Sequence, residues 1–221
     1  MAFWDRIFGS RSRPALSASP LESLFAAMNL EKVSKSMAEA DSLQQLCDGV
    51  TLLVMHLANN VTGQLRKVGA VGLSGDVIRP DIALSESALF WHWCLNRSAR
   101  LWAQNSGLGD DSPVEDSVQK SEFVTIAMIC KYSTFGGDKI SNWARLRSYR
   151  ESVDPAEQIS RTLSMSRGSD VLVVNAQVNH SVADVALYAA CATAFIHMLK
   201  PSSDVVTMAM ARVSGSRKSG Q

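Results

Sequence analysis

A spacing suited to binding an anion occurs twice in this chain. The pattern is W-x-x-x-R-S-x-R, and its members are Trp93, Arg97 and Arg100 in the first copy and Trp143, Arg147 and Arg150 in the second. On a helix, residues at i, i+4 and i+7 lie on one face. Guanidinium groups donate paired hydrogen bonds to phosphate or carboxylate oxygens, and an indole ring offers a surface for stacking. These faces are therefore predicted to bind a small anion, nucleic acid or an acidic protein surface.

A structural interpretation competes with binding at the same residues. The arginine stems can cover the indole rings without binding a ligand. Trp93 can instead pack against a neighbouring helix while the arginines pair with acids nearby, which are Asp110, Asp111, Glu115 and Asp116. In that case the basic and acidic regions satisfy each other within the fold.

Other residue patterns that carry chemistry are weak. His92 is the one histidine near the first copy and is a candidate polar group of a pocket there. His180 and Asp184 stand at i, i+4, but Asp184 is explained by a helix start at Ser181, and neither an E-x-x-H nor an H-E-x-x-H pattern is present. A P-loop and a G-x-S-x-G nucleophile motif are also missing. We expect no metal and no cofactor, assign no catalytic residue, and favour a protein that is not an enzyme.

The first 18 residues form an unusual segment. Phe3, Trp4, Ile7 and Phe8 recur at helical spacing, and arginines, serines and prolines follow. This composition predicts a short amphipathic helix on a flexible tether. It can pack on this domain or on a partner, lie in a membrane interface, or be a cleaved transit segment.

The starts of several helices are marked by capping signals. Ser19-Pro20-Leu21-Glu22, Ser112-Pro113-Val114-Glu115 and Asp154-Pro155-Ala156-Glu157 each combine an N-cap oxygen, a proline at the first helical position and a glutamate three residues after the cap. Asp138, after two glycines, is expected to cap a further helix. Helices are therefore predicted to begin at these points.

The spacing of apolar residues is also helical. Between 84 and 103 a single stripe is expected to face the core, and it comprises Leu84, Ala88, Trp91, Leu95, Ala99 and Trp102. Further helices are predicted over residues 43–65, 114–132, 139–150, 156–165 and 182–199, with another over 204–213. The predicted fold is an all-α bundle of about six or seven helices in one domain, residues 19–213, with a disordered tail over 214–221.

Two segments also fit strands. Residues 171–178 and 205–213 are rich in β-branched residues or alternate in polarity. If both are strands, they are expected to pair as a minor β-hairpin near the C-terminus.

Composition limits the compartment and the partners. The chain has 221 residues, 22 Lys and Arg against 21 Asp and Glu, and four cysteines without a C-x-x-C pair. A balanced charge argues against a dedicated nucleic-acid-binding protein. No secretory signal is visible, and the longest uncharged apolar run, residues 185–196, is shorter than the ~20 residues that span a bilayer. We expect buried free thiols and a cytoplasmic protein, membrane-peripheral if the first 18 residues bind lipid.

Three functions are compatible with these features. The first is a helical module that binds a protein partner or a second copy of itself, favoured because fold signals are strong and catalytic signals are absent. The second is a pocket protein or enzyme that binds a small ligand carrying phosphate or carboxylate. The third is a peripheral membrane protein anchored by the first 18 residues.

Overall fold

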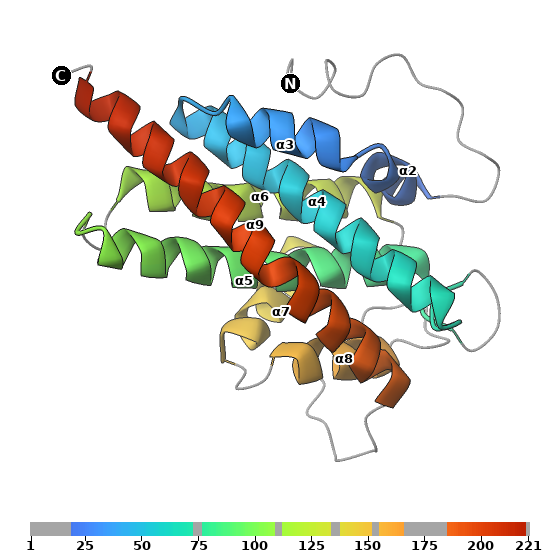
Figure 1. Cartoon of the computed structure of the whole chain (residues 1–221). Helices are drawn as coiled ribbons and strands as arrows, with labels where there is room; N and C mark the ends of the chain where they lie inside the picture. Colours follow the sequence, from blue (N-terminus) through green and yellow to red (C-terminus); the bar gives the residue numbers. More distant parts are fainter. Residues whose placement is uncertain are drawn as a thin grey trace.

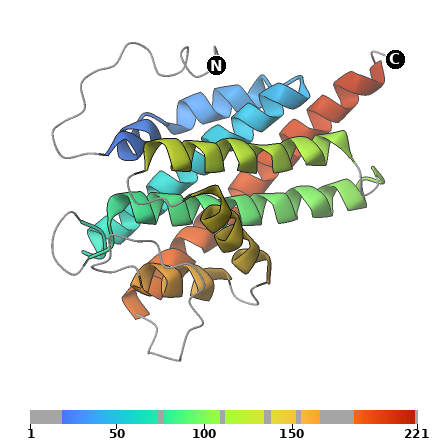
Figure 2. The same cartoon turned by 180° about the vertical axis from the view of Figure 1, so that it is seen from behind.

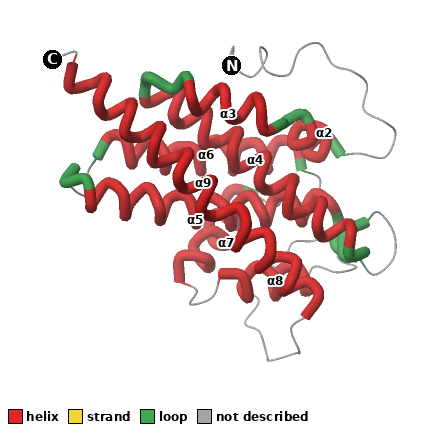
Figure 3. The backbone as a smooth tube through the Cα atoms, in the orientation of Figure 1, coloured by secondary structure: helices red, strands yellow, loops and turns green. Residues whose placement is uncertain are grey.

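The structure is a computed structural model, and it describes residues 19–72, 77–108, 112–133, 138–151, 155–165 and 185–219. Eight helices lie within these ranges, and they are α2 (Pro20–Ala26), α3 (Leu30–Ala38), α4 (Leu43–Lys67), α5 (Pro80–Asn105), α6 (Pro113–Tyr132), α7 (Lys139–Glu151), α8 (Pro155–Met165) and α9 (Val185–Ser219). Figure 1 shows their arrangement. No strand occurs in the described part of the chain (Figure 3), so the predicted all-α bundle is confirmed.

The helices α4 and α5 form the centre of the bundle. Each packs against α6 and α9, while α3 covers α4 and the short helices α7 and α8 pack against α5. Helix α9 crosses the bundle diagonally in Figure 1, and α6 lies in front when the molecule is seen from behind in Figure 2. No helix among the described residues is long and apolar enough to span a membrane.

The core stripe predicted for α5 is present. Leu84, Ala88, Trp91, Leu95 and Ala99 are buried, and Trp102 is half-buried against the core. Because this helix is buried by neighbours on several sides, further residues between Pro80 and Phe90 are buried as well.

The predicted helix starts are largely confirmed. Ser19 accepts a hydrogen bond from the backbone N–H of Glu22, whose carboxylate accepts one from Ser19 N–H in return. Asp138 caps α7 by accepting from the N–H of Ser141 at 2.8 Å. Helix α6 begins at Pro113 as expected, but the side chain of Ser112 makes no capping hydrogen bond.

The minor β-hairpin is wrong, because residues 205–213 are part of α9. Residues 171–178 lie outside the described residues. The apolar side chains of the second segment are buried at helical steps of three and four, and they are Val206, Ala209, Met210 and Val213. Burial of this stripe favours the helix over the intrinsic preference of its β-branched residues for strands.

Helix α9 also continues through Pro201, so the helices predicted over 182–199 and 204–213 are one. A proline inside a helix removes one backbone hydrogen bond and costs ~3 kcal/mol. Contacts on both sides offset this cost, since Cys191 and Ala194 are buried before the proline and Val206 after it. The helix extends beyond residue 213, where the tail is expected to begin, to Ser219.

The four cysteines are free, and Cys47, Cys94 and Cys191 are buried. Burial raises the pKa of Cys47 to about 11 and that of Cys191 to about 12. These thiols are therefore neutral near pH 7, and they pack as small apolar side chains.

Candidate functional site

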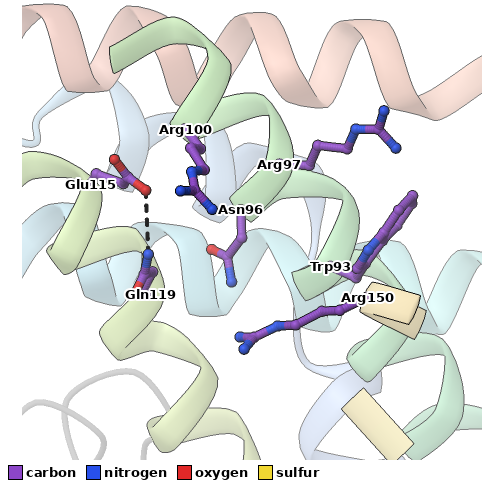
Figure 4. Close-up of a pocket in the computed structure, with 7 residues that line it drawn as sticks. All are labelled: Trp93, Asn96, Arg97, Arg100, Glu115, Gln119 and Arg150. Atoms are coloured by element: carbon purple, nitrogen blue, oxygen red, sulfur yellow. Dashed lines mark hydrogen bonds between the residues drawn. The ribbon is translucent and has the colours of Figure 1, made fainter. Parts of the chain in front are cut away.

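A cleft of about 380 Å³ opens between α5, α6 and the end of α7. We call it the arginine cleft, and the residues that line it are Trp93, Asn96, Arg97, Arg100, Glu115, Gln119 and Arg150. Figure 4 shows these side chains. The lining therefore contains three arginines and one glutamate.

The cleft brings together four of the six residues predicted from the repeated pattern. Trp93, Arg97 and Arg100 contribute from α5, and Arg150 contributes from α7. The whole first copy is present because a single face of α5 carries it. The second copy therefore reaches the cleft only through its last arginine.

The other two members of the second copy lie elsewhere. Trp143 packs edge-on against Phe123, with ring centroids 4.8 Å apart. Arg147 is exposed and pairs with Glu151 at 2.8 Å. Arg145 and Tyr149 are buried on the opposite face of α7. Of the three residues on the outer face, only Arg150, in the last turn of the helix, lines the cleft, while Trp143 and Arg147 lie nearer its start.

Arg150 is held in place by a buried carboxylate. Its Nη2 lies 3.1 Å from Glu122 Oε1 and 2.9 Å from Oε2. Asn96 donates a further hydrogen bond to Oε1. Burial raises the pKa of Glu122, while the positive charge of Arg150 lowers it. This pair neutralises Arg150 and fixes one wall of the cleft.

Arg97 and Arg100 differ from Arg150 because neither forms an ion pair within the described residues. The guanidinium carbon of Arg97 lies over the Trp93 ring, 5.6 Å from its centroid. In Figure 4, Arg100 extends toward Asn96, and Arg97 extends away from Glu115 and Gln119 on the side of Trp93. Among the residues that the structure describes, no carboxylate thus neutralises these two positive charges.

The α6 wall carries the acid of the cleft. Glu115 is buried, and its Oε1 accepts a hydrogen bond from Gln119 at 3.3 Å. The competing interpretation from sequence, in which arginines pair with acids of the 110–116 segment, is realised by neither Arg97 nor Arg100 in the described part of the chain. Asp110 and Asp111 lie outside the described residues.

His92 lies in the core and not at the cleft, so its predicted place as a polar group of the pocket is corrected. Its ring is fully buried, with Nε2 2.7 Å from Thr125 Oγ1 and Nδ1 3.4 Å from Ser121 Oγ. Burial lowers the pKa of His92 to about 3, so the ring is neutral near pH 7. The cause of this placement is its position beside Trp91 on the buried side of α5.

A buried ionic cluster between α5 and α7 was not predicted from the sequence. Glu86 of α5 accepts hydrogen bonds from the Arg145 guanidinium and the Tyr149 hydroxyl of α7. The distance from Arg145 Nε to Glu86 Oε2 is 2.6 Å. The only sequence signal is the i, i+4 spacing of Arg145 and Tyr149, which places them on one face of a helix.

The fold and the cleft define an all-α helical bundle with a surface cleft lined by arginine and tryptophan. No protein-family model, no curated protein and no solved structure matches the chain.

Among the residues that the structure describes, no three His, Cys, Asp or Glu side chains gather as they would around a metal ion. The apolar residues of the N-terminal segment, Phe3, Trp4, Ile7 and Phe8, lie outside the described residues.

Proposed function

We propose that this protein is a non-catalytic helical pocket protein that binds a small ligand carrying a carboxylate or phosphate in the arginine cleft. One observation carries the proposal. Arg97 and Arg100 place two guanidinium groups in one cleft beside Trp93, and neither has a carboxylate partner in the described part of the chain. A ligand anion supplies a partner that the described residues do not.

The neighbouring side chains support this binding mode. Charge-assisted hydrogen bonds from arginine to an anion are stronger than neutral ones, and a guanidinium fork matches the two oxygens of a carboxylate. Trp93, which is half-buried and lies beneath the Arg97 guanidinium, provides apolar surface for the uncharged part of the ligand. The Arg150 and Glu122 pair keeps the wall rigid without adding net charge. The lining offers binding groups, which favours binding over catalysis.

Removing both available arginines is expected to weaken anion binding by about 10- to 100-fold, because each hydrogen bond to a charged group contributes roughly 1.5–3 kcal/mol when buried and less at an open cleft. Calorimetric titration of the parent and the Arg97→Ala, Arg100→Ala variant with inorganic phosphate, acetate and phenyl phosphate measures this loss.

The matched control for that titration is Arg147→Ala, which removes an exposed arginine outside the cleft. This variant is expected to bind like the parent. An equal loss in both variants, or no measurable anion binding by the parent, contradicts the proposal.

We propose as a second candidate that the protein binds a second copy of itself through α6 and α7. The specific observation is an exposed apolar patch, where Phe123 is 60% and Ile140 is 82% exposed. Trp143 contacts Phe123 in the same patch. Large exposed apolar side chains that adjoin one another are typical of interaction surfaces.

Introducing charge at this patch is expected to convert a dimer to a monomer, because an aspartate desolvated in an interface is costly. Sedimentation equilibrium of the parent and of the Phe123→Asp, Ile140→Asp variant tests this. Leu30→Asp on α3 is the control, since Leu30 is also 60% exposed but lies on another element. A monomeric parent rules the second candidate out.

We also propose a cytoplasmic location for the protein. The free buried thiols Cys47, Cys94 and Cys191 support it, because reducing compartments keep cysteines in this state. A peripheral membrane function depends on residues 1–18 and stays a prediction from sequence.

A further inference from the structure

A second hollow of about 240 Å³ lies between α5 and α9. We call it the apolar hollow, and the residues that line it are Trp93, Cys94, Arg97, Ser98, Leu101 and Leu199. Trp93 and Arg97 also line the arginine cleft. The two depressions therefore meet along one tryptophan and one arginine.

The chemistry of the apolar hollow differs from that of the arginine cleft. Leu101 is 52% exposed, and Leu199 packs half-buried against the core. Burial raises the pKa of the Cys94 thiol well above its ordinary range, so Cys94 is a neutral wall residue. Apart from Arg97 and Ser98, the hollow offers only apolar surface and a buried thiol.

The polar group of Ser98 is already engaged. Its hydroxyl lies 3.2 Å from the carbonyl oxygen of Cys94, to which it donates, and 2.8 Å from Ser203 Oγ on α9. The second contact joins α5 to α9 beside the hollow. A ligand segment in this hollow therefore meets no unsatisfied serine hydroxyl and gains mainly by covering apolar surface.

Trp93 and Arg97, which line both hollows, connect the arginine cleft to the apolar hollow. The Arg97 guanidinium lies over the Trp93 ring and, in Figure 4, points away from Glu115 and Gln119. A ligand whose anion lies at Arg100 and Arg97 can extend its remaining part across Trp93 toward Leu101 and Leu199. Together the two hollows have the size of an ordinary small-molecule site.

We propose that the ligand of this site is a free amphiphilic anion, a carboxylate or phosphate monoester that carries a straight alkyl chain of medium length. This inference rests on the proposed anion-binding function and adds the chemical class of the ligand. The anion occupies the arginine cleft, and the alkyl chain occupies the apolar hollow.

The experiment is a chain-length series measured by calorimetry on the full chain, with every ligand kept monomeric. The ligands are acetate, hexanoate, octanoate and decanoate, together with inorganic phosphate and octyl phosphate. Each added methylene that enters the hollow is expected to strengthen binding about two- to fourfold, because burying a CH₂ contributes up to about 0.8 kcal/mol. Octanoate that binds no more tightly than acetate overturns the inference.

Two variants separate this inference from the proposed function. Leu101→Ser is expected to flatten the chain-length dependence while phosphate binding stays unchanged, since Leu101 lines the apolar hollow and not the arginine cleft. The Arg97→Ala, Arg100→Ala variant is expected to weaken every ligand of the series. Leu30→Ser, on α3, is the control for an exposed leucine. A chain-length dependence that persists unchanged in Leu101→Ser overturns the assignment of the hollow.

The remaining outcomes of the ligand series distinguish failure of the amphiphile from failure of the anion-binding cleft. Phosphate binding without a chain-length effect leaves the anion cleft standing and removes the amphiphile. Failure of every ligand removes both proposals. Cosedimentation with vesicles of phosphatidic acid and phosphatidylcholine is the arm for a bilayer source, and tighter binding to these vesicles than to monomeric octyl phosphate overturns the assignment to a free amphiphile.

Discussion

Replacing Glu86 by alanine is expected to lower the free energy of unfolding by about 3–5 kcal/mol, because it leaves the Arg145 guanidinium buried without its carboxylate. Glu86 is 1% exposed and Arg145 is 3% exposed, so the charged pair is shielded from bulk water in the folded chain. The same carboxylate accepts a hydrogen bond from the Tyr149 hydroxyl. Two polar groups of α7 thus depend on one glutamate of α5.

The surroundings of the cluster explain why the loss is large. Arg145 Nη1 donates to Asn142 Oδ1 at 2.8 Å, so one further bond holds the guanidinium in the core after Glu86 is removed. Burial, followed by the negative charge of Glu86, holds the pKa of Tyr149 well above its ordinary range. Tyr149 therefore stays protonated and loses its acceptor in the variant.

Urea denaturation of the parent and the Glu86→Ala variant near pH 7 measures this effect. Glu151→Ala is the matched control, because it removes an exposed ion pair from α7, the helix that carries Arg145, and is expected to change the stability little. The triple variant Glu86→Leu, Arg145→Met, Tyr149→Phe removes the charges and the hydroxyl together and is expected to recover most of the stability. A loss in Glu86→Ala as small as that of the control contradicts the prediction.

The same cluster shows where prediction from sequence ends. Helix α5 follows the rule that apolar periodicity marks the buried face, so its core stripe is predicted correctly from residues such as Trp91 and Leu95. Helix α7 breaks that rule, since its buried face carries Asn142, Arg145 and Tyr149. A polar buried face cannot be recognised from hydrophobic periodicity, because its partner, Glu86, lies on a different helix.

The packing of α7 also explains why only part of the site predicted from the repeated pattern is found at the arginine cleft. The two copies of the W-x-x-x-R-S-x-R pattern are equivalent in sequence, but only the fold decides which face of each helix is buried. Arg150 is held at the cleft by Glu122, which lies 28 residues away in the chain. Arg147 instead pairs with Glu151 on the same helix. Local pairs follow from spacing on a helix, while contacts between helices require the packing of the bundle.

Helices α3 and α9 show two further limits. Helix α3 was not predicted, although Asn29 caps it by accepting from the Lys32 N–H at 2.8 Å, because its buried stripe consists of only Val33 and Met37. The helices predicted over 182–199 and 204–213 lie on either side of Pro201, and a proline inside a helix is unfavourable. Tertiary burial on both sides of a residue can override such a local preference, and only the structure shows that burial.

His92 is expected to make the protein sensitive to acid, and the sign follows from its lowered pKa. Burial lowers the pKa of His92 from the ordinary 6.5 to about 3. Above pH 6.5 the ring is neutral in both the folded and the unfolded chain, so it contributes no pH dependence. Between pH 6.5 and 3 the unfolded chain binds a proton that the folded chain excludes. As the pH falls from 6.5 to 3, the contribution of His92 to the free energy of unfolding therefore decreases, by about 1.4 kcal/mol per pH unit and about 5 kcal/mol in all.

The acid effect of His92 is opposed by a buried carboxyl group. Burial raises the pKa of Glu122, so the folded chain keeps this proton at a higher pH than the unfolded chain does. Glu122 thus adds stability as the pH falls through its titration. Because the two contributions have opposite signs, the pH dependence of the parent alone does not isolate the histidine, and a variant is needed.

The test compares the parent with His92→Gln by urea denaturation at a series of pH values from 7 to 3.5. Glutamine keeps hydrogen-bonding groups near Thr125 and Ser121 but does not bind a proton in this range. At pH 7 the variant is expected to be less stable than the parent, and toward pH 3.5 the difference is expected to shrink by several kcal/mol, because only the parent loses the contribution of the excluded proton. His197→Gln, which removes an exposed histidine of α9, controls for the change in net charge. The contrary outcome is that the free energies of unfolding of the parent and His92→Gln change with pH in parallel. The ring would then take up its proton in the folded chain, and the core around α5 would have to admit a charge.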